Sequence, residues 1–191
     1  MTKLASWHLK LHSYYSWAYL EKSFSSDECD AIVEYCDKLP LEKALLGEGN
    51  EDSLTRSNLV GWVDEQDDFC VWLYERLTSC VTRINDEFWN FNLDYIQPLQ
   101  YTKYRSVGDH YNSHIDMGKG PHYRKLSFSL QLTDETSYSG CDLQITECGQ
   151  NVKREKGTIN FFPSYALHNV TPLESGERNA LVGWVCGPNF K

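Results

Sequence analysis

Residues 100–118 read QYTKYRSVGDHYNSHIDMG, and the interpretation of the whole chain starts from this stretch. It completes one strand-like run, Tyr95–Tyr104, and contains the next, Asn112–Ile115. His114 and Asp116 form an H-x-D pair around the end of the second run. Residues two apart on a strand point to the same face, so an imidazole and a carboxylate placed in this way can reach one ion together.

A third ligand is available in FFPSYALHNV, residues 161–170, where His168 lies at the end of a later strand-like run. Two histidines and one carboxylate on one face of an octahedral ion leave three positions open, as expected for oxygen-activating iron(II). The H-x-D pair alone is equally compatible with a surface or core pair that binds no metal. The predicted metal ligands are therefore a hypothesis that rests on His114, Asp116 and His168 together.

One arginine and one tyrosine near these positions suit an anionic ligand. Arg178 lies in ESGERNALVGWV, residues 174–185, and its planar guanidinium can bind a carboxylate through two parallel hydrogen bonds. A surface arginine paired with Glu174 or Glu177 would account for the same sequence. Tyr104 precedes the H-x-D histidine by ten residues and either binds the same ligand from a neighbouring strand or is an ordinary strand tyrosine.

The N-terminal half predicts helices. Ser25 and Glu28 have capping-box spacing and predict a helix that ends at Pro40. A polar loop, 41–53, and a short strand, 59–63, follow. A second helix of about five turns, for which Asp64 is a candidate cap, has an apolar stripe. The stripe comprises Phe69, Trp72, Leu73, Leu77, Cys80 and Ile84.

The C-terminal half predicts strands separated by turns. The strand-like runs after Tyr95–Tyr104 are 112–115, 125–132, 142–146, 151–153, 157–162 and 180–185. Helices followed by a series of short strands indicate an α+β fold whose second part is an antiparallel sandwich or barrel. A chain of 191 residues fits one such domain.

Composition narrows the class of protein. The net charge of −9 disfavours nucleic acid as a main partner. Basic pairs such as Arg124–Lys125 are expected on a solvated face. Seven cysteines without a C-x-x-C pair indicate free thiols in a reducing compartment. The N-terminus has no apolar signal-peptide core, and no apolar run approaches the ~20 residues of a membrane span. The expected location is the cytoplasm, without membrane contact.

Several motifs resemble one enzyme family. Residues 100–118 are similar to the tyrosine-glycine-H-x-D stretch of prolyl-4-hydroxylase-type iron(II)/2-oxoglutarate oxygenases. Residues 157–184 resemble their distal histidine and arginine segment, especially in the PKHD-type hydroxylase branch. SGCDLQI, residues 139–145, resembles the family's G-G-x-L strand, with Cys141 replacing the second glycine. The similarity covers roughly residues 24–187.

The resemblance implies a fold and a set of functional positions. The implied fold is a double-stranded β-helix, or jelly roll, with supporting N-terminal helices. A single domain would span 1–191, with a helical part at about 24–90 and the jelly-roll core at about 95–187. By position, the implied iron ligands are His114, Asp116 and His168, and the implied 2-oxoglutarate contacts are Arg178, Tyr104, Trp184 and Gln131. Gln131 stands where some relatives have a tyrosine, so its contact is expected to differ.

The implied activity is hydroxylation of an unactivated C–H bond by a dioxygenase that uses Fe(II), 2-oxoglutarate and O2, with ascorbate as a supporting reductant. The favoured substrate is a prolyl residue in a peptide or protein. A free amino acid, a lysyl residue and another small molecule stay open. The carboxylate of Asp116 favours hydroxylation over halogenation, since related halogenases lack it. Residues 41–53 lie where relatives have a segment that closes over a peptide, and are either a lid or a plain loop.

Other classes fit less well. Related nucleic-acid demethylases have a second arginine shortly after the first, whereas Arg178 is followed by Asn-Ala-Leu-Val-Gly-Trp. A catalytically silent jelly-roll binding module is expected to have lost at least one of the four iron and 2-oxoglutarate residues. A cupin metal site would need an H-x-H motif, which the sequence lacks.

Overall fold

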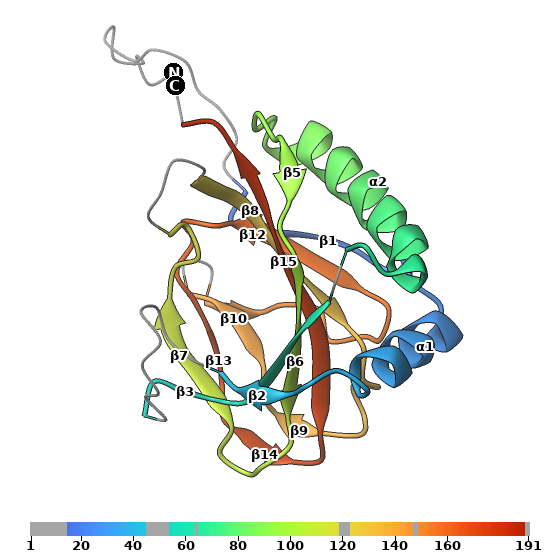
Figure 1. The fold of residues 1–191 in the computed structure, drawn as a ribbon. Helices are drawn as coiled ribbons and strands as arrows, with labels where there is room; N and C mark the ends of the chain where they lie inside the picture. Colours follow the sequence, from blue (N-terminus) through green and yellow to red (C-terminus); the bar gives the residue numbers. More distant parts are fainter. Residues whose placement is uncertain (1–14, 45–53, 64, 119–122, 147–148, 190–191) are drawn as a thin grey trace, which may run out of the picture.

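Two large antiparallel sheets, a small two-stranded sheet and two α-helices form the main elements of the described part of the chain (Figure 1). A computed structural model describes residues 15–44, 54–63, 65–118, 123–146 and 149–189. The eight-stranded sheet runs in the order β1 (Ala18–Leu20), β12 (Ile159–Pro163), β8 (Tyr123–Gln131), β15 (Arg178–Gly187), β6 (Leu99–Tyr104), β4 (Leu59–Val63) and β2 (Glu42–Lys43), and β5 (Tyr95–Ile96) pairs with β15. The five-stranded sheet runs β11 (Gln150–Asn151), β10 (Leu143–Ile145), β13 (His168–Val170), β7 (His110–His114) and β3 (Arg56–Ser57). A small pair joins β14 (Leu173–Ser175) to β9 (Ser139–Gly140).

Both helices lie against the outer face of the eight-stranded sheet, on the side away from the five-stranded sheet (Figure 1). Helix α1 (Ser26–Cys36) begins at the predicted capping box, in which Ser25 and Glu28 exchange hydrogen bonds. Helix α2 (Val71–Phe88) buries Leu73, Leu77 and Ile84 on its predicted stripe. Neither helix has the length and apolar character that a membrane span requires.

The alternation of side chains along the central strands separates a packing face from a cavity face. On β6, Leu99 and Tyr101 pack in the core beneath the helices, whereas Gln100, Thr102 and Tyr104 line a cavity on the other face. Strand β15 repeats this pattern, with Leu181 and Val185 in the core and Arg178, Val182 and Trp184 on the cavity side. The period of two in a strand thus directs polar groups inward between the two sheets.

The predicted boundaries need correction at several places. Helix α1 ends at Cys36, before Pro40, with Asp37 as its C-cap. The predicted cap Asp64 lies outside the described residues, and α2 instead follows a 3-10 turn, η2 (Asp68–Cys70), whose N-cap is Asp67. The Asp67 carboxylate accepts a hydrogen bond from the Phe69 amide at 2.9 Å.

The strand assignments are also corrected. The run 95–104 divides into β5 and β6 on either side of Pro98, which has no amide hydrogen to donate to a ladder. The predicted loop 41–53 begins with a strand, because Glu42 and Lys43 pair with β4; residues 45–53, and with them most of the lid hypothesis, lie outside the described residues. Strands β1, β3, β9, β13 and β14, of two or three residues each, were not expected.

Candidate active site

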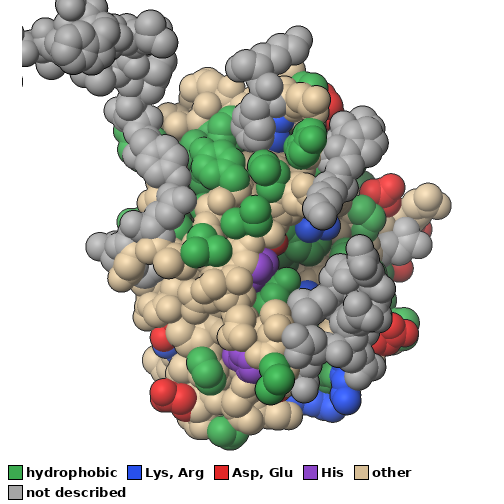
Figure 2. All heavy atoms as spheres, turned by 90° about the vertical axis from the view of Figure 1, so that its left-hand side faces the viewer, with side chains coloured by type: hydrophobic (Ala, Val, Ile, Leu, Met, Phe, Trp, Pro, Cys, Tyr) green, Lys and Arg blue, Asp and Glu red, His purple; other side chains and the backbone are tan. Residues whose placement is uncertain are grey.

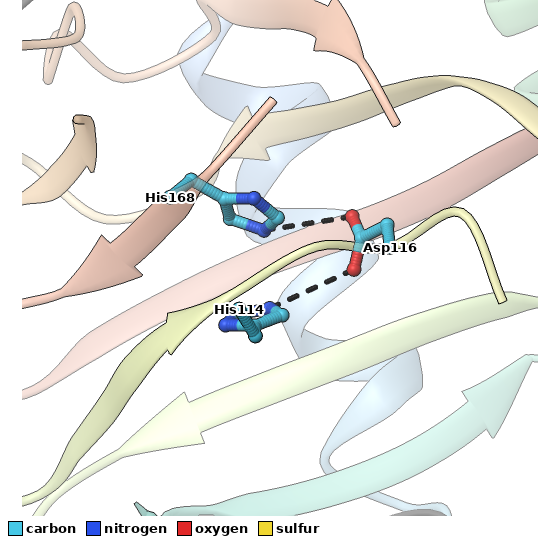
Figure 3. Close-up of side chains that lie close together, drawn as sticks. All are labelled: His114, Asp116 and His168. Atoms are coloured by element: carbon cyan, nitrogen blue, oxygen red, sulfur yellow. Dashed lines mark ion pairs between the residues drawn. The ribbon is translucent and has the colours of Figure 1, made fainter. Parts of the chain in front are cut away.

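His114, Asp116 and His168 meet between the two sheets (Figure 3). His114 is the last residue of β7 and pairs across the ladder with His168, the first residue of β13. The predicted position of His168 at the end of a strand-like run is therefore wrong, since it begins a new strand. The His114 Nε2 atom lies 3.6 Å from one carboxylate oxygen of Asp116, and the His168 Nε2 atom lies 3.5 Å from the other.

Hydrogen bonds orient both imidazoles toward this common point. The His114 Nδ1 atom lies 2.8 Å from the carbonyl oxygen of Asn112, and the His168 Nδ1 atom lies 3.0 Å from that of Ala166. A carbonyl only accepts, so each Nδ1 carries the hydrogen and each Nε2 presents a lone pair. Burial, reinforced by the neighbouring His168, lowers the pKa of His114 to about 4, so this imidazole is in its metal-binding neutral form at neutral pH.

The carboxylate is held separately from the strand that carries His114. The predicted strand 112–115 is β7 (His110–His114), and Asp116 lies two residues beyond its end. The Asp116 amide donates to the carbonyl oxygen of Ser164 at 2.8 Å. The buried Ser127 hydroxyl donates to Asp116 Oδ2 at 2.8 Å and also contacts the Ser164 hydroxyl at 2.8 Å. These contacts fix the carboxylate opposite the two imidazoles.

The three side chains fit a divalent metal ion. One ligand atom from each lies within 4.8 Å of the others. Two imidazoles and one carboxylate are the donors of a facial triad, in which iron(II) keeps open positions for other ligands. Ordered partners behind every ligand are what such a centre needs to keep its geometry.

Tyr111 and Arg56 form a column of stacked groups against the His114 ring. The Tyr111 ring lies 3.6 Å from the His114 ring, centroid to centroid, with only 19° between the planes. The Arg56 guanidinium lies 4.4 Å above the same tyrosine ring. Neither Arg56 nor Tyr111 was singled out from the sequence. The strand β3 that carries Arg56 has only two residues and produces no periodic signal.

Arg178 lines the same cavity. Its side chain is buried, with 3% of the residue exposed, and it donates to the Gln131 side-chain oxygen at 2.9 Å. Its cross-strand partner on β6 is Tyr104, whose ring centroid lies 5.5 Å from the guanidinium carbon. Glu177 instead pairs with Lys103, so a surface ion pair does not explain Arg178. A buried cation without a counter-ion is costly, and this position therefore suits an anion.

The remaining wall of the cavity is aromatic and basic. Trp184 lines it, is 7% exposed, and has a buried indole N–H without a hydrogen-bond partner among the described residues. The Arg124 guanidinium lies 3.9 Å above that indole ring. The expectation of a solvated Arg124–Lys125 pair is wrong, because Arg124 lines the cavity and Lys125 is buried.

These residues enclose a cavity of about 330 Å³ that opens at the surface shown in Figure 2, where a histidine side chain is visible between hydrophobic groups. All three residues of the candidate metal centre contribute to its lining. The volume suits a small organic ligand beside the metal centre.

Comparison with known proteins agrees with this geometry. Residues 99–186 match the model of the 2OG-Fe(II) oxygenase superfamily. The match covers slightly less than half of the chain. The matched segment contains all three residues of the cluster, together with Arg178, Tyr104, Gln131 and Trp184.

The similar curated proteins have PKHD-type hydroxylase names. One from Hyphomonas neptunium is 39% identical over 102 residues, which is 48% of this chain and 46% of that protein. Another, from Synechococcus sp. (strain CC9311), is 40% identical over 78 residues, or 39% of this chain and 36% of that protein. The chain thus spans less than half the length of these relatives.

Solved structures extend the likeness to nearly the whole chain. A Pseudomonas putida prolyl-4-hydroxylase has a TM-score of 0.70 at 20% identity and covers 91% of this chain and 94% of its own. A Trichoplax adhaerens prolyl hydroxylase, in complex with a hypoxia inducible factor oxygen degradation domain peptide fragment, has a TM-score of 0.72 at 17% identity and covers 89% of this chain and 83% of its own. This likeness confirms the predicted α+β fold, a double-stranded β-helix with supporting helices.

Proposed function

We propose that the protein is an iron(II)- and 2-oxoglutarate-dependent dioxygenase that hydroxylates an unactivated C–H bond. The observation that carries the proposal is the presence, in one cavity, of a two-histidine, one-carboxylate cluster and a buried arginine without a counter-ion. A catalytically silent jelly-roll module has no need of either feature.

Each group of residues has a defined part in this proposal. His114, Asp116 and His168 hold the iron, which together with 2-oxoglutarate and O2 supplies the oxidation of the C–H bond. Arg178 binds the distal carboxylate of 2-oxoglutarate through its guanidinium fork. Tyr104 packs beside that fork.

Two further residues complete the proposed pocket. Gln131 orients Arg178 by accepting from Nη2, in place of the tyrosine of some relatives. Trp184 forms the wall between the co-substrate and the cavity mouth. The walls of the cavity limit the access of water to the reacting groups, so that oxidation is directed to the bound substrate.

We infer that the favoured substrate is a prolyl residue in a peptide or protein, with a free amino acid, a lysyl residue or another small molecule as alternatives. The names of the two similar structures described above, both prolyl hydroxylases, support this choice. We also propose that the protein acts in the cytoplasm, where its six described cysteines, all free, would stay reduced.

The first experiment is an anaerobic titration of the metal-free protein with iron(II) and 2-oxoglutarate, followed by the weak visible charge-transfer band of the chelate. The band should disappear in His168→Ala and need far more 2-oxoglutarate in Arg178→Ala. Arg83→Gln, on the exposed side of α2, removes the same charge away from the cavity and should behave like wild type. A folded protein without the band would contradict the proposal and favour the silent module.

The second experiment tests the substrate. The protein is incubated with iron(II), 2-oxoglutarate, ascorbate, O2 and a broad set of proline-containing peptides, and the peptides are examined by mass spectrometry. A gain of one oxygen on proline is the expected result. Succinate formation without any oxidised peptide would exclude the prolyl substrate while retaining the dioxygenase activity.

A further inference from the structure

The arginines of the protein fall into two groups according to their partners. Of the seven arginines, four are not exposed: Arg56, Arg124, Arg154 and Arg178. Arg154 has a carboxylate partner, Asp142, at 2.7 Å. The other three have no carboxylate within 4.0 Å among the residues that the structure describes, and all three line the same cavity.

The two arginines outside the proposed 2-oxoglutarate site are held by neutral groups only. Arg56 donates from Nε to Asn58 at 2.8 Å and from Nη2 to Gln100 at 2.9 Å. Arg124 donates from Nε to Gln97 at 2.8 Å. The aromatic rings beneath them, Tyr111 and Trp184, orient the two guanidinium planes without neutralising them. Each guanidinium therefore keeps its full charge and some free donors.

Burial makes this arrangement costly unless an anion completes it. Loss of water around Arg124 lowers its pKa, an effect that nearby Asp116 opposes. Arg56 and Arg124 come from different sheets, β3 and β8, so a ligand in the cavity lies between elements that carry one guanidinium each. The Trp184 indole N–H, buried and without an acceptor among the described residues, adds a third donor beside Arg124.

The proposed metal and co-substrate do not account for this charge. Counted together, the charges of iron(II), the dianion of 2-oxoglutarate, Asp116 and Arg178 sum to zero. Arg56 and Arg124 then leave two positive charges in the cavity of a protein whose net charge is −9. An interior excess of one sign, opposite to that of the whole molecule, indicates selection for a ligand of complementary charge.

We propose that Arg56 and Arg124 bind a carboxylate of the primary substrate, next to the carbon that is hydroxylated. This inference rests on the proposed function and specifies its substrate class. The carboxylate belongs either to an acidic residue that flanks the target in a peptide or to the substrate's own chain end. Both sources present two oxygens that match guanidinium donors and the indole N–H.

The test measures binding, so that it does not depend on turnover. Two blocked, fluorescein-labelled peptides share a proline-containing sequence and differ only in having glutamate or glutamine on both sides of the proline. Their dissociation constants are measured by anisotropy under anaerobic conditions with iron(II) and 2-oxoglutarate. N-acetylproline and N-acetylprolinamide serve as competitors, because they separate a chain-end carboxylate from a side-chain one.

Wild-type protein should prefer a carboxylate over the matching amide by about tenfold or more. Arg56→Gln and Arg124→Gln should each remove most of this preference, whereas Arg56→Lys and Arg124→Lys retain part of it. The control Arg83→Gln removes one charge from α2 and should keep the full preference. The preference should also decrease as salt concentration rises.

Equal affinity for both members of each pair would overturn the inference, as would an equal loss of preference in the Arg83 control. Succinate formation is measured separately in the same preparations. A protein that prefers carboxylates but never forms succinate would refute the proposed function and retain the arginine site. A protein that forms succinate and oxidises glutamine peptides as well as glutamate peptides would refute the arginine site and retain the proposed function.

Discussion

Ser127→Ala should weaken metal binding although Ser127 is not a ligand. The residue is fully buried, and its hydroxyl is the only side-chain donor to Asp116 Oδ2 among the described residues. A hydrogen bond to a charged group contributes about 1.5–3 kcal/mol. Loss of a group that orients a metal ligand typically lowers affinity about 10- to 100-fold, or about 1.4–2.7 kcal/mol, and the two ranges overlap. We therefore expect a decrease within that range.

Ser164→Ala is the matched control. Ser164 contributes its hydroxyl to Ser127 at 2.8 Å, and only its backbone carbonyl contacts Asp116. The Ser164 variant thus loses a buried hydroxyl of the same size but keeps the donor to the carboxylate, and its affinity should change much less.

Affinity is measured by anaerobic iron(II) titration at a fixed 2-oxoglutarate concentration. Urea unfolding of the metal-free variants shows whether both have lost comparable stability, about 1 kcal/mol each. If the two variants bind iron(II) equally well, the Ser127 hydroxyl does not position Asp116, and the reasoning from this hydrogen bond is refuted.

Three further predictions concern stability, measured by urea unfolding. Ser25→Ala removes the acceptor of the Glu28 amide and should cost about 1 kcal/mol; no loss would mean that the capping box contributes nothing. Gly157→Ala should cost about 2–5 kcal/mol, because φ is +81° and a Cβ would lie 2.1 Å from the Phe24 carbonyl oxygen; a smaller cost would show that this contact relaxes easily. Burial raises the pKa of Cys29 to about 11 and that of Cys36 to about 12. Unfolding therefore releases protons above pH ~9, and the free energy of unfolding should fall as the pH rises beyond that value. A Cys29→Ala, Cys36→Ala double variant should show a shallower fall.

Local patterns predicted much of the fold because they depend on neighbours in sequence. The capping box at Ser25 and the strand Leu59–Val63 are confirmed at the predicted residues. The start of α2 was predicted too early, because several acidic residues precede it and spacing alone does not show that Asp67 caps a 3-10 turn before the helix begins at Val71. Strands such as β3 are too short to show a period and form only because β7 offers them a partner.

The residues of the candidate site that belong to a sequence motif could be predicted. Those that reach the cavity only because the two sheets pack together could not. His114, Asp116, His168 and Arg178 were selected from the sequence, and the structure brings them into one cavity. Arg124 was assigned to a solvated face, because its neighbour Lys125 made the pair resemble an exposed cluster. No sequence pattern near Arg124 shows that its guanidinium packs on the ring of Trp184, sixty residues later in the chain.

The strand β15 also constrains which insertions and deletions the protein tolerates. Arg178 and Trp184 both face the cavity from this strand, and its register irregularity falls only after Val185, so the ladder between them is continuous. Six steps of about 3.3 Å separate them by about 20 Å. One inserted residue would turn one of the two side chains to the opposite face, whereas two would keep both faces and lengthen the interval by about 7 Å. Adaptation to a ligand of different length is therefore expected to insert or delete two residues at a time in β15. Surface loops, which have no such alternation of faces, are not restricted to even numbers.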